Sequence, residues 1–527
     1  MTESVRPRRE PAGNAPADRS LGPRVAAALV FFSSSAVLVV ELVALRLLAP
    51  YLGLTLETNT LVIGVALTAI AAGAWIGGRL ADVGYPRRLL GPALGVSGAV
   101  VAATPAAVRW AAEVTPNGFL PVAMVCILVP GALLSAVTPI VTKLRLTDLG
   151  ETGTIVGRLS GVGTAGAIAG TVLTGFVLIS RVPVSVILLG LGLALLAAAL
   201  VVDWRVGGWS RRARLLTAGA VAGGGLGAVL APGGCDVETT YHCALVVQDP
   251  DYSAGRILVL DGVAHSYVDL SDPTALEFEY VEALASVSDV AFPAGEPLSA
   301  HHLGAGGVTF PRYVEAERPG TTSTISEIDG AVVELGFDEL GVKGEENIDI
   351  RVEDARLGLE ELPADSQDLV VGDAFGGVSV PFHLTTQEFM TDIQRVLAED
   401  GTYSANLIDN PPLAFARAET ATLEEVFEHV VVLAPPDVAD GVAGGNLVAV
   451  ASDAPIPTDE IDARLAERGS TWRTLEGEAL AEWVGDAPVL TDDYAPVDQL
   501  LTPYADAMDV AAAGARHGQG RRVTGAV

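Results

Sequence analysis

The sequence predicts an α-helical multi-pass membrane domain followed by an α/β domain built on a doubly wound parallel sheet. Half of the 527 residues are hydrophobic, and they gather in long runs in the first part. Charge divides the chain as well: residues 1–232 hold 18 Lys and Arg against 10 Asp and Glu, whereas residues 233–527 hold 14 against 54. Apolar strands alternate with helical stretches in the second part. A chain of this length also predicts at least two domains.

The membrane domain is predicted over residues 25–232, with about seven transmembrane helices and the lipid bilayer as its partner. Each hydrophobic run is close to the ~20 residues that cross a ~30 Å hydrocarbon layer as a helix. A cleaved signal peptide would account for the first run alone. The runs lie near 25–48, 59–78, 89–108, 119–141, 155–179, 182–202 and 214–232.

Arginine and lysine gather before the first run and after the second, fourth and sixth. By the positive-inside rule the N-terminal tail, residues 1–24, is cytoplasmic. Seven spans then place the following domain on the extracytoplasmic side of the cell membrane, and an error of one span reverses that result. The basic residues are Arg6, Arg8, Arg9, Arg19, Arg24, Arg79, Arg87, Arg88, Lys143, Arg145, Arg158, Arg205, Arg211, Arg212 and Arg214.

Three features of the membrane half have two interpretations each. Residues 78–88 resemble a cytoplasmic loop motif of major facilitator transporters, or they form an ordinary basic loop. Small residues spaced by four over 157–175 predict close helix packing, or they line a substrate path. Glu41 lies deep in the first run. It is either a functional group, because buried charge is costly, or a structural partner of Arg46 or of an arginine on another helix.

The second part is strongly acidic, so we expect no nucleic-acid partner. The whole chain has only two lysines, Lys143 and Lys343. Abundant acids and few lysines are typical of halophilic proteins, whose self-repulsion is screened by salt. The alternative explanation of the lysine count is a GC-rich genome, which favours Arg, Ala and Gly over Lys.

Two cysteines, Cys235 and Cys243, follow the last hydrophobic run. Outside the cytoplasm they are candidates for a disulfide, and inside it they are two unpaired thiols. Cys126 lies within the fourth run and is interpreted as a packing residue. The histidines and cysteines show no metal-ligand spacing, so no metal is expected.

The α/β domain is predicted over residues 236–505, with a β-hairpin at 244–261 and a helix that runs from Thr385–Thr386 to Leu397 with a threonine as its N-cap. The tail, residues 506–527, is rich in Ala, Gly and Arg and is expected to be disordered. Sheet strands are predicted near 299–303, 321–326, 347–352, 368–372, 402–408, 427–434 and 446–452.

Ligands bind such sheets at the carboxyl ends of the strands, where this chain places a glycine turn and three acids. The first strand runs into the turn 304–307, and the second ends at Glu327. That acid follows the turn by about 20 residues, the spacing of an acid that holds ribose hydroxyls. Asp354 and Asp373 follow the third and fourth strands. The acids therefore predict a nucleoside-binding edge, or they are ordinary helix N-caps.

Several short motifs in register make residues 240–500 resemble the spermidine synthases. The whole layout resembles the membrane-fused spermidine synthase-like (polyamine aminopropyltransferase-like) proteins, whose soluble domain has a Rossmann-like methyltransferase/spermidine synthase fold. The motifs are Leu260–Ser266, Glu277–Glu282, the glycine turn, Ser326–Asp329, Glu353–Ala355, Gly372–Ala374 and Thr491–Val497.

The resemblance implies an S-adenosyl co-substrate, either S-adenosylmethionine or its decarboxylated form, and no metal. Glu327 would hold the ribose, while Asp354 and Ala355 would face adenine. Gly304 and Gly306 would let the backbone close on the ligand.

The resemblance also implies that Asp373 is the catalytic residue and that Tyr280 and His265 bind substrate. An amine must be uncharged to attack the carbon beside a sulfonium, so a carboxylate helps to orient it and to remove its proton. A polyamine is cationic, and its pocket needs several acids to replace lost hydration.

The chain departs from the family at the amine side of this site. Gly307 and Gly376 stand where the family has acids that face the amine. Val281 replaces a histidine after the paired tyrosine, and His265 replaces a glutamine. The adenosyl side is therefore predicted to be intact and the amine side altered.

Three functions follow from these patterns. The first is a membrane-anchored transferase that moves a group, such as aminopropyl, from an S-adenosyl compound to a polyamine or another nucleophile. The second is a transporter or membrane sensor whose acidic domain binds a nucleoside or polyamine without catalysis. The third is a structural relic of a synthase fold, kept for assembly. A homo-oligomer is compatible with each, and fold analogy alone does not decide among them.

Overall fold

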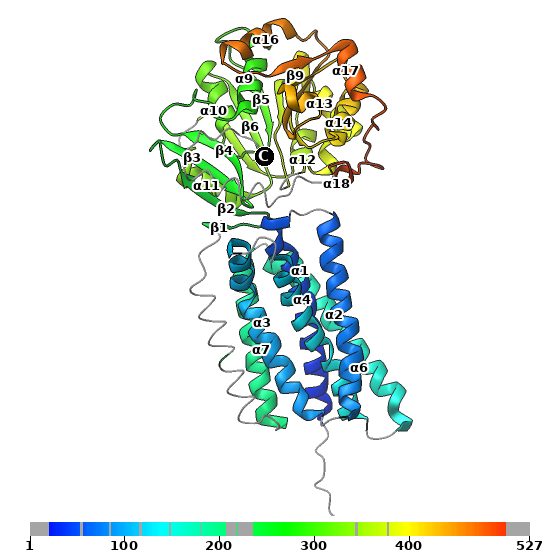
Figure 1. Cartoon of the computed structure of the whole chain (residues 1–527). Coiled ribbons are helices and arrows are strands. Elements are labelled where there is room, and N and C mark those ends of the chain that lie inside the picture. Colours follow the sequence, from blue (N-terminus) through cyan, green and yellow to red (C-terminus); the bar gives the residue numbers. More distant parts are fainter. Residues whose placement is uncertain are drawn as a thin grey trace, which may run out of the picture.

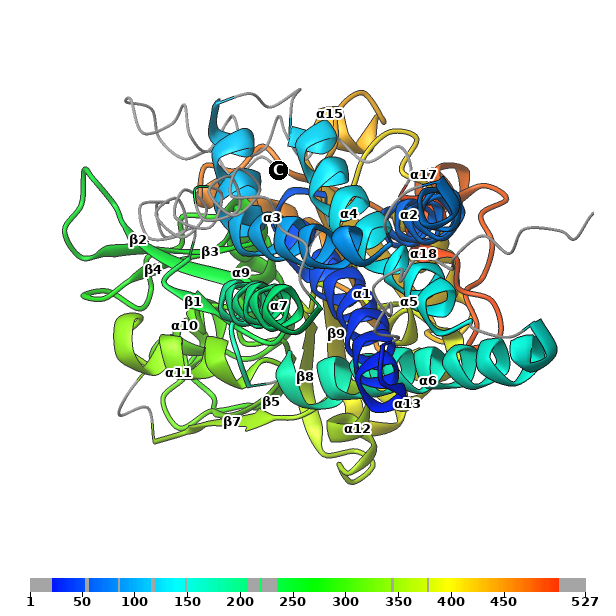
Figure 2. The ribbon, with the colours of Figure 1, turned by 90° about the horizontal axis from the view of Figure 1, so that it is seen from below.

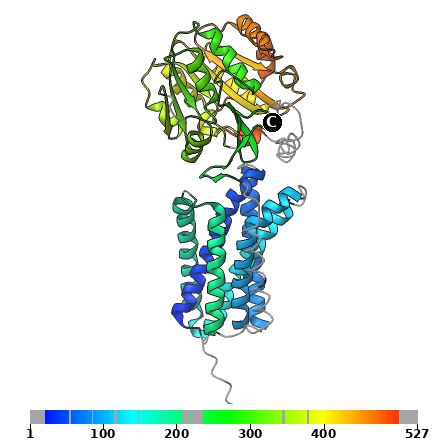
Figure 3. The ribbon, with the colours of Figure 1, turned by 90° about the vertical axis from the view of Figure 1, so that its left-hand side faces the viewer.

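The computed structural model describes residues 21–52, 56–83, 86–114, 119–146, 149–179, 181–206, 219, 235–342, 346–376 and 379–501. The chain forms a bundle of long helices with an α/β domain at one end of it (Figure 1). The same arrangement is seen from the side in Figure 3. The expected tails, 1–20 and 502–527, lie outside the described residues.

Six candidate membrane spans are present among the described residues, which confirms the multi-pass prediction. The expected seventh span, 214–232, lies outside the described residues apart from residue 219. The fourth span is broken at Ala136, where Pro139 has no N–H to donate to the carbonyl of Ser135. The helices are α1 (Pro23–Leu52), α2 (Leu56–Val83), α3 (Arg87–Val114), α4 (Phe119–Ser135), α5 (Val137–Arg145), α6 (Thr152–Leu173) and α7 (Val184–Val206).

Glycines bring the helices of the bundle into close contact. Gly98 of α3 and Gly192 of α7 face each other, and a Cβ on either would lie 2.7 Å from the other's carbonyl oxygen. Gly166 and Gly170 of α6 contact the α1 backbone in the same way, at Phe31 and Ser35. Small residues allow such close approach in membranes. At its start α6 leans away from the other helices (Figure 2).

The N-terminal end of α1 and the α/β domain lie at opposite ends of the bundle (Figures 1 and 3). At the far end, Arg145 donates a 2.9 Å hydrogen bond to the carbonyl of Leu21. At the near end, Arg109 of α3 forms a 2.7 Å ion pair with Glu238 of the α/β domain. A second contact joins the parts there, because the backbone N–H of Leu56 donates to Asp498 (3.0 Å).

The α/β domain contains an antiparallel four-stranded sheet in the order β1-β2-β3-β4 and a mixed eight-stranded sheet in the order β12-β10-β11-β9-β8-β5-β6-β7. The small sheet comprises β1 (Val237–Glu238), β2 (Cys243–Gln248), β3 (Gly255–Leu260) and β4 (Val263–Asp269). The large sheet comprises β5 (Ser299–Leu303), β6 (Thr322–Glu327), β7 (Ile348–Val352), β8 (Gln367–Gly372), β9 (Leu397–Asp409), β10 (His429–Ala434), β11 (Gly445–Ser452) and β12 (Arg473–Leu475).

The Rossmann-like fold prediction is confirmed, with one correction to the sheet. All seven predicted strands form, and five of them, β5 to β9, pair in parallel. β11, however, pairs antiparallel with both β9 and β10. The link from β10 to β11 is too short for the dozen or more residues that a parallel crossover needs. The predicted hairpin forms between β2 and β3, and β1, β4 and β12 were not predicted.

Helices cover both faces of the large sheet, because alternate strand residues point to opposite sides. Val370 packs on the face covered by α12, α13, α14 and α17, whereas Leu369 and Val371 pack on the face covered by α9, α10 and α16. The helices are α9 (Glu279–Ala291), α10 (Thr309–Glu317), α11 (Gly330–Glu339), α12 (Ala355–Glu360), α13 (Gln387–Val396), α14 (Ala414–Glu424), α15 (Pro436–Ala439), α16 (Thr458–Glu467), α17 (Gly477–Val484) and α18 (Val497–Leu500).

Candidate functional site

The carboxyl ends of four neighbouring strands, β8, β5, β6 and β7, carry the residues that the sequence analysis singled out. Asp373 follows β8, the turn 304–307 follows β5, Glu327 ends β6, and Asp354 follows β7. The strands pair in parallel, so these residues lie along one edge of the sheet. They form a single candidate site instead of being scattered over the domain.

The glycine turn is held by hydrogen bonds to its neighbours on both sides. Gly304 adopts a φ of 97°, a conformation that favours glycine, and its N–H donates to the carbonyl of Ser326 (2.9 Å). Gly306 also has a positive φ, of 47°. The N–H of Gly307 donates to the hydroxyl of Ser266 on β4 (2.8 Å), which ties the turn to the small sheet. The backbone is thus fixed at a place where a ligand can approach it closely.

Glu327 is fixed by two backbone donors. The N–H of Ala305 donates to its Oε2 (2.9 Å), and the N–H of Asp329 donates to its Oε1 (2.8 Å). Burial raises the pKa of Glu327, and the two N–H donors oppose that shift. Each carboxylate oxygen keeps a further lone pair, so the group can still accept hydrogen bonds from a pair of hydroxyls.

Asp354 is the N-cap of α12, as one of the two interpretations predicts. Its Oδ1 accepts from the N–H groups of Arg356 (3.0 Å) and Leu357 (3.3 Å). Its Oδ2 lies 3.1 Å from Nε2 of His383. Capping therefore uses one oxygen, and the second oxygen pairs with a half-exposed imidazole. Ala355 is buried directly behind it.

Asp373 is buried at the end of β8 and accepts two hydrogen bonds. Nδ2 of Asn406 donates to Oδ1 (2.8 Å), and the hydroxyl of Tyr280 donates to Oδ2 (3.2 Å). Burial raises the pKa of Asp373 to about 6, and both hydrogen bonds oppose the shift. Burial also raises the pKa of Tyr280 well above its ordinary value, so the phenol remains a donor. A carboxylate with a pKa near 6 is suited to accept a proton at neutral pH.

A small enclosed cavity of about 30 Å³ lies between Asp373 and the small sheet. This volume admits about two water molecules. Its polar lining includes Asp373, Tyr280, Ser266, Glu277 and His302. Burial lowers the pKa of His302 to about 3, so that imidazole is neutral and adds no charge to the cavity. Aromatic and aliphatic side chains make up the rest of the wall, among them Phe278, Leu284 and Phe310.

His265 does not line this cavity in the described structure. It lies beside His242, with 6.4 Å between the ring centroids, and burial lowers its pKa to about 4. Its Nε2 is buried and has no hydrogen-bond partner among the described residues. Tyr280 and Asp373 thus meet at one point of the site, whereas His265 lies apart from them, on the side of the small sheet that carries His242.

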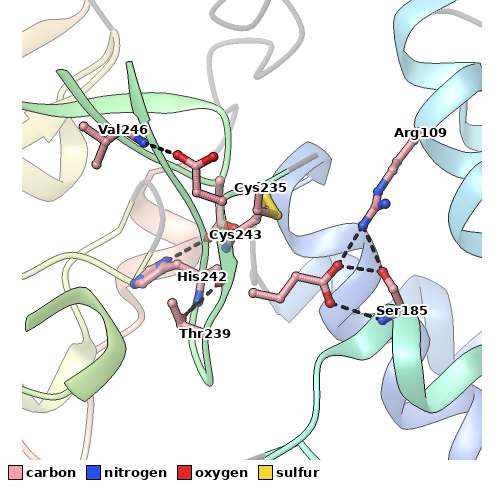
Figure 4. The surroundings of a disulfide bond; sticks show 10 residues. Arg109, Ser185, Cys235, Thr239, His242, Cys243 and Val246 are labelled. Carbon is pink, nitrogen blue, oxygen red and sulfur yellow. Dashed lines mark hydrogen bonds and ion pairs between the residues drawn. A yellow bond between two sulfur atoms is a disulfide. The ribbon is translucent and has the colours of Figure 1, made fainter. Parts of the chain in front are cut away.

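Cys235 and Cys243 are joined by a disulfide, with their Cα atoms 5.3 Å apart (Figure 4). The bond closes the segment that leads from the bundle into β2. Cys126 is a free, buried cysteine. Among the described residues no three His, Cys, Asp or Glu side chains are grouped to hold a metal ion.

Sequence reasoning missed three residues of the site. Asn406 stands in the middle of the apolar strand β9, and a buried amide inside such a run was the only signal for it. Ser266 lies in a motif that was noted, but its contact with the glycine turn depends on the fold of β4. His383 precedes α13, and nothing in its local sequence indicates that it pairs with Asp354.

Comparison with known proteins identifies distant relatives of the α/β domain. No protein-family model matches the chain. A polyamine aminopropyltransferase from Vibrio vulnificus is 25% identical over 214 residues, covering 38% of this chain and 68% of the relative. A polyamine aminopropyltransferase from Chromobacterium violaceum is 25% identical over 141 residues, covering 27% of this chain and 53% of the relative.

Solved structures give matches of the same kind. A probable spermidine synthase from Corynebacterium glutamicum has 29% identity and a TM-score of 0.46, covering 49% of this chain and 95% of that one. A spermidine synthase in complex with the transition-state analogue AdoDATO has 18% identity and a TM-score of 0.33, covering 51% of this chain and 86% of that one. The predicted resemblance is confirmed at this distance: a polyamine aminopropyltransferase-like domain follows six long apolar helices.

Proposed function

We propose that the α/β domain binds an S-adenosyl compound at the carboxyl edge of its sheet and acts as a membrane-anchored transferase. The observation that carries the proposal is the hydrogen-bonded set at that edge. The Ala305 N–H donates to Glu327, and the N–H of Asp373 donates to the carbonyl of Leu303 (3.0 Å), next to the glycine turn. A ribose-holding carboxylate and a proton-accepting carboxylate therefore flank one turn on which a ligand can lie.

In this proposal each residue binds a different part of the ligand. Glu327 accepts hydrogen bonds from the two ribose hydroxyls, and Asp354 and Ala355 face the adenine. Gly304 and Gly306, both with positive φ, shape the turn whose backbone faces the sulfur-bearing part of S-adenosylmethionine or its decarboxylated form. Distant similarity to polyamine aminopropyltransferases supports this assignment.

The reaction we propose is a direct displacement at the carbon beside the sulfonium sulfur. The lone pair of an uncharged amine attacks that carbon, and the carbon–sulfur bond breaks with its electron pair moving to sulfur. The sulfur becomes a neutral thioether, and the nitrogen loses a proton to Asp373. Tyr280 and Asn406 hold the Asp373 carboxylate in place for that step.

The amine side of the site has been rebuilt relative to the family. A Cβ on Gly307 would lie 2.6 Å from Val268 and 2.8 Å from Ser266, so β4 fills the space that an acidic side chain would need. Asp373 and Glu277 are the acids among the residues that line the cavity. A long polycation would lose hydration without matching carboxylates, which favours an acceptor with a single amine or another compact nucleophile.

The test is product formation by the full chain in detergent. The protein is incubated with decarboxylated S-adenosylmethionine or S-adenosylmethionine and with acceptors of increasing length, from a short monoamine to spermidine. Mass spectrometry then measures the thioether nucleoside and the alkylated acceptor. We expect both products in equal amounts, with the compact acceptors reacting faster. Absence of both products with every acceptor, although the ligand binds, would overturn the transferase and leave a binding domain.

A second function, a transporter or sensor, is favoured by a cavity in the helix bundle. The cavity has a volume of about 620 Å³ and lies among α1, α2, α4, α5 and α6. Its lining includes Ser34, Ser135, Thr138 and Ile70, and it reaches the ion pair between Lys143 and Asp82 (2.8 Å) at the far end. Asp82 lies at the end of α2, within the segment 78–88 that resembles the facilitator motif. Apart from that pair, the described residues of the lining carry no charge, which suits a neutral or amphipathic solute better than a polyamine.

Two measurements separate the functions. Uptake of a labelled nucleoside into proteoliposomes, abolished by Ser135→Phe in the cavity but not by Val186→Phe on the exposed side of α7, would support transport. Reporter fusions at residue 240 locate the α/β domain. By the positive-inside rule we expect it outside the cytoplasm, because basic residues lie near the starts of α1 and α3 and near the ends of α2, α5 and α7. A cytoplasmic result would give the site direct access to cytosolic S-adenosyl compounds.

A further inference from the structure

Two asparagine side chains form a hydrogen-bonded chain that ends on the Asp373 carboxylate. Nδ2 of Asn446 on β11 donates to Oδ1 of Asn406 on β9 (2.9 Å). Nδ2 of Asn406 donates in turn to Oδ1 of Asp373 (2.8 Å). Asn406 is 3% exposed, and Asn446 is half-buried. Asn446 thus touches the proposed proton acceptor only through another amide.

The register of β9 and β11 places the two amides side by side. The strands pair antiparallel, with Asn406 directly opposite Val448. Asn446 precedes Val448 by two residues, so it points to the same face of the sheet and is a diagonal neighbour of Asn406. Val448 packs in the cluster on the face that α9 covers, and α9 carries Tyr280. Both amides therefore lie on the side of the sheet from which the Tyr280 phenol reaches the site.

The direction of the chain favours an ionised carboxylate. An amide has a donor end and an acceptor end, whereas an ionised carboxylate only accepts. If the Asn406 amide were reversed, its oxygen would face Asp373 and its NH₂ group would face that of Asn446. Relieving the second conflict would require both amides to turn together, and one of them lies inside the packed core. Hydrogen bonds in series also strengthen one another, so Asn446 makes Asn406 a better donor.

The two oxygens of Asp373 consequently differ in what they can accept. Oδ1 faces the N–H of Asn406, which cannot become an acceptor while Asn446 donates to its oxygen. Oδ2 accepts from the hydroxyl of Tyr280 (3.2 Å), and a hydroxyl has lone pairs of its own and can rotate to accept instead. Tyr280 also lines the cavity of about 30 Å³. A proton can therefore bind Oδ2 without leaving either oxygen against an unmatched partner.

Hydrogen bonds, and no neighbouring cation, offset the burial of this carboxylate. Among the described residues that line the cavity there is no Arg or Lys. Burial lowers the pKa of His302 to about 3, and it raises the pKa of both tyrosines, so these three groups are neutral. β9 and β11 contribute the two amides. The titratable groups that share the cavity with Asp373 are Tyr280 of α9, Tyr267 of β4, His302 of β5 and Glu277, which precedes α9.

We propose that Asn446 is a positioning residue for the transfer: it holds Asn406 as a donor to Oδ1 of Asp373, so that the carboxylate stays ionised and takes the amine proton at Oδ2. This inference rests on the proposed function, because it assigns a residue to the same proton transfer. In that step the N–H bond of the attacking nitrogen breaks, its electron pair stays on nitrogen, and the proton moves to Oδ2. The Tyr280 hydroxyl then rotates to accept from the new O–H group.

The test uses infrared spectroscopy of the full chain in detergent to follow the protonation of Asp373 with pH. Each protein is compared with its own Asp373→Asn form, and the difference gives the titration midpoint of this one carboxyl group. Asn446→Leu keeps the size of the side chain but donates nothing, and it should raise the midpoint by about half a pH unit. Asn446→Asp presents only acceptors to Asn406 and should raise the midpoint by at least about one unit.

Two further measurements separate positioning from a general effect on folding. In single-turnover transfer with a saturating S-adenosyl ligand, the rising part of the pH profile should move with the infrared midpoint. Affinity for that ligand should stay at the wild-type value, because Asn446 acts only through the carboxylate. The control is Asn347→Leu: Nδ2 of Asn347 donates to Glu315 (2.8 Å) at an exposed position, so its loss should not move the midpoint. Thermal unfolding of each variant identifies a loss of folding.

The possible outcomes distinguish this inference from the proposed function. Unchanged midpoints in both Asn446 variants would overturn the inference, even if the wild type transfers a group as proposed. A midpoint that moves equally in Asn347→Leu would overturn it as well, because the effect would not depend on the chain of amides. A wild type that transfers nothing would reject the proposed function and the role of Asn446 in it, and the infrared midpoints would tell this result from the first.

Discussion

Gly304 faces the carbonyl oxygen of Asp373 so closely that a Cβ on the glycine would lie 2.5 Å from that oxygen. The glycine also has a φ of 97°, a backbone conformation that residues other than glycine rarely adopt. Two separate costs therefore oppose any substitution: backbone strain and a collision with the backbone of the proposed catalytic residue.

Gly304→Ala should lower the free energy of unfolding by about 2–3 kcal/mol and abolish ligand binding, because both costs apply. Chemical denaturation measures the first effect and calorimetry the second. Gly441→Ala is the matched control, since Gly441 has a φ of 67° but open space around its Cα. It should cost about 1 kcal/mol from strain alone and leave binding unchanged. Equal costs at the two positions would show that the contact with Asp373 does not matter.

Asp354 has a capping role and a proposed ligand role, and two substitutions separate them. Asp354→Asn keeps an N-cap side chain, so stability should stay near the wild type while affinity for the adenosyl ligand falls about tenfold. Asp354→Ala should lose affinity and about 1 kcal/mol of stability as well. If the asparagine variant binds as tightly as the wild type, the acid is a helix cap and nothing more.

Asp373→Asn should bind the adenosyl ligand with nearly wild-type affinity and lose transfer activity by at least about 100-fold, the usual contribution of a positioned base. Asparagine can keep the hydrogen bond from Tyr280, but it cannot accept the amine proton. Single-turnover kinetics with a saturating ligand measure the step. Full turnover by this variant would show that Asp373 is not the residue that accepts the amine proton.

The pH dependence follows from the raised pKa of Asp373, about 6 in the folded protein. The carboxylate must be ionised to accept a proton, so the transfer rate should rise as pH increases through about 6 and level off above pH 7 unless the acceptor amine still titrates there. An acceptor whose nucleophilic group does not titrate between pH 5 and 8 isolates the contribution of Asp373 to the pH dependence. A rate that is flat between pH 5 and 7 would contradict the assignment.

Salt should stabilise the acidic part of the chain. Residues 233–527 carry 54 acids against 14 basic residues, and their mutual repulsion is screened over about 10 Å at 0.1 M salt and about 3 Å at 1 M. The unfolding temperature of the full chain should therefore rise when KCl is increased from 0.1 to 2 M, as the halophilic interpretation predicts. Sucrose serves as the uncharged control, and a larger rise in sucrose than in KCl would argue against screening.

The periodicity of the chain was sufficient to predict most of the fold. Seven strand positions follow from apolar runs, and the capped start of α13 follows from Thr386, whose hydroxyl accepts from the N–H of Phe389. Six long helices follow from hydropathy. The antiparallel direction of β11 could not be predicted, because a buried strand has the same run of apolar residues whether it pairs parallel or antiparallel.

The site was predictable only where local sequence determines it. Glu327, Asp354 and Asp373 are strand-end residues, so parallel strand order brings them together. Asn406, His383 and Ser266 approach the same edge through contacts between distant segments. Nothing in their neighbouring residues indicates these contacts, because they depend on how distant strands and helices of the domain pack against each other.

The most direct test is a calorimetric titration of the full chain with S-adenosylmethionine, run in parallel on the wild type and on Glu327→Gln. The substitution keeps the size of the side chain, but it removes the charge that the ribose hydroxyls would meet and one of the two oxygens that accept the N–H groups of Ala305 and Asp329. We predict saturable one-to-one binding by the wild type and an affinity at least about tenfold weaker in the variant. Identical titration curves for the two proteins would contradict the claim that this edge of the sheet holds an adenosyl ligand.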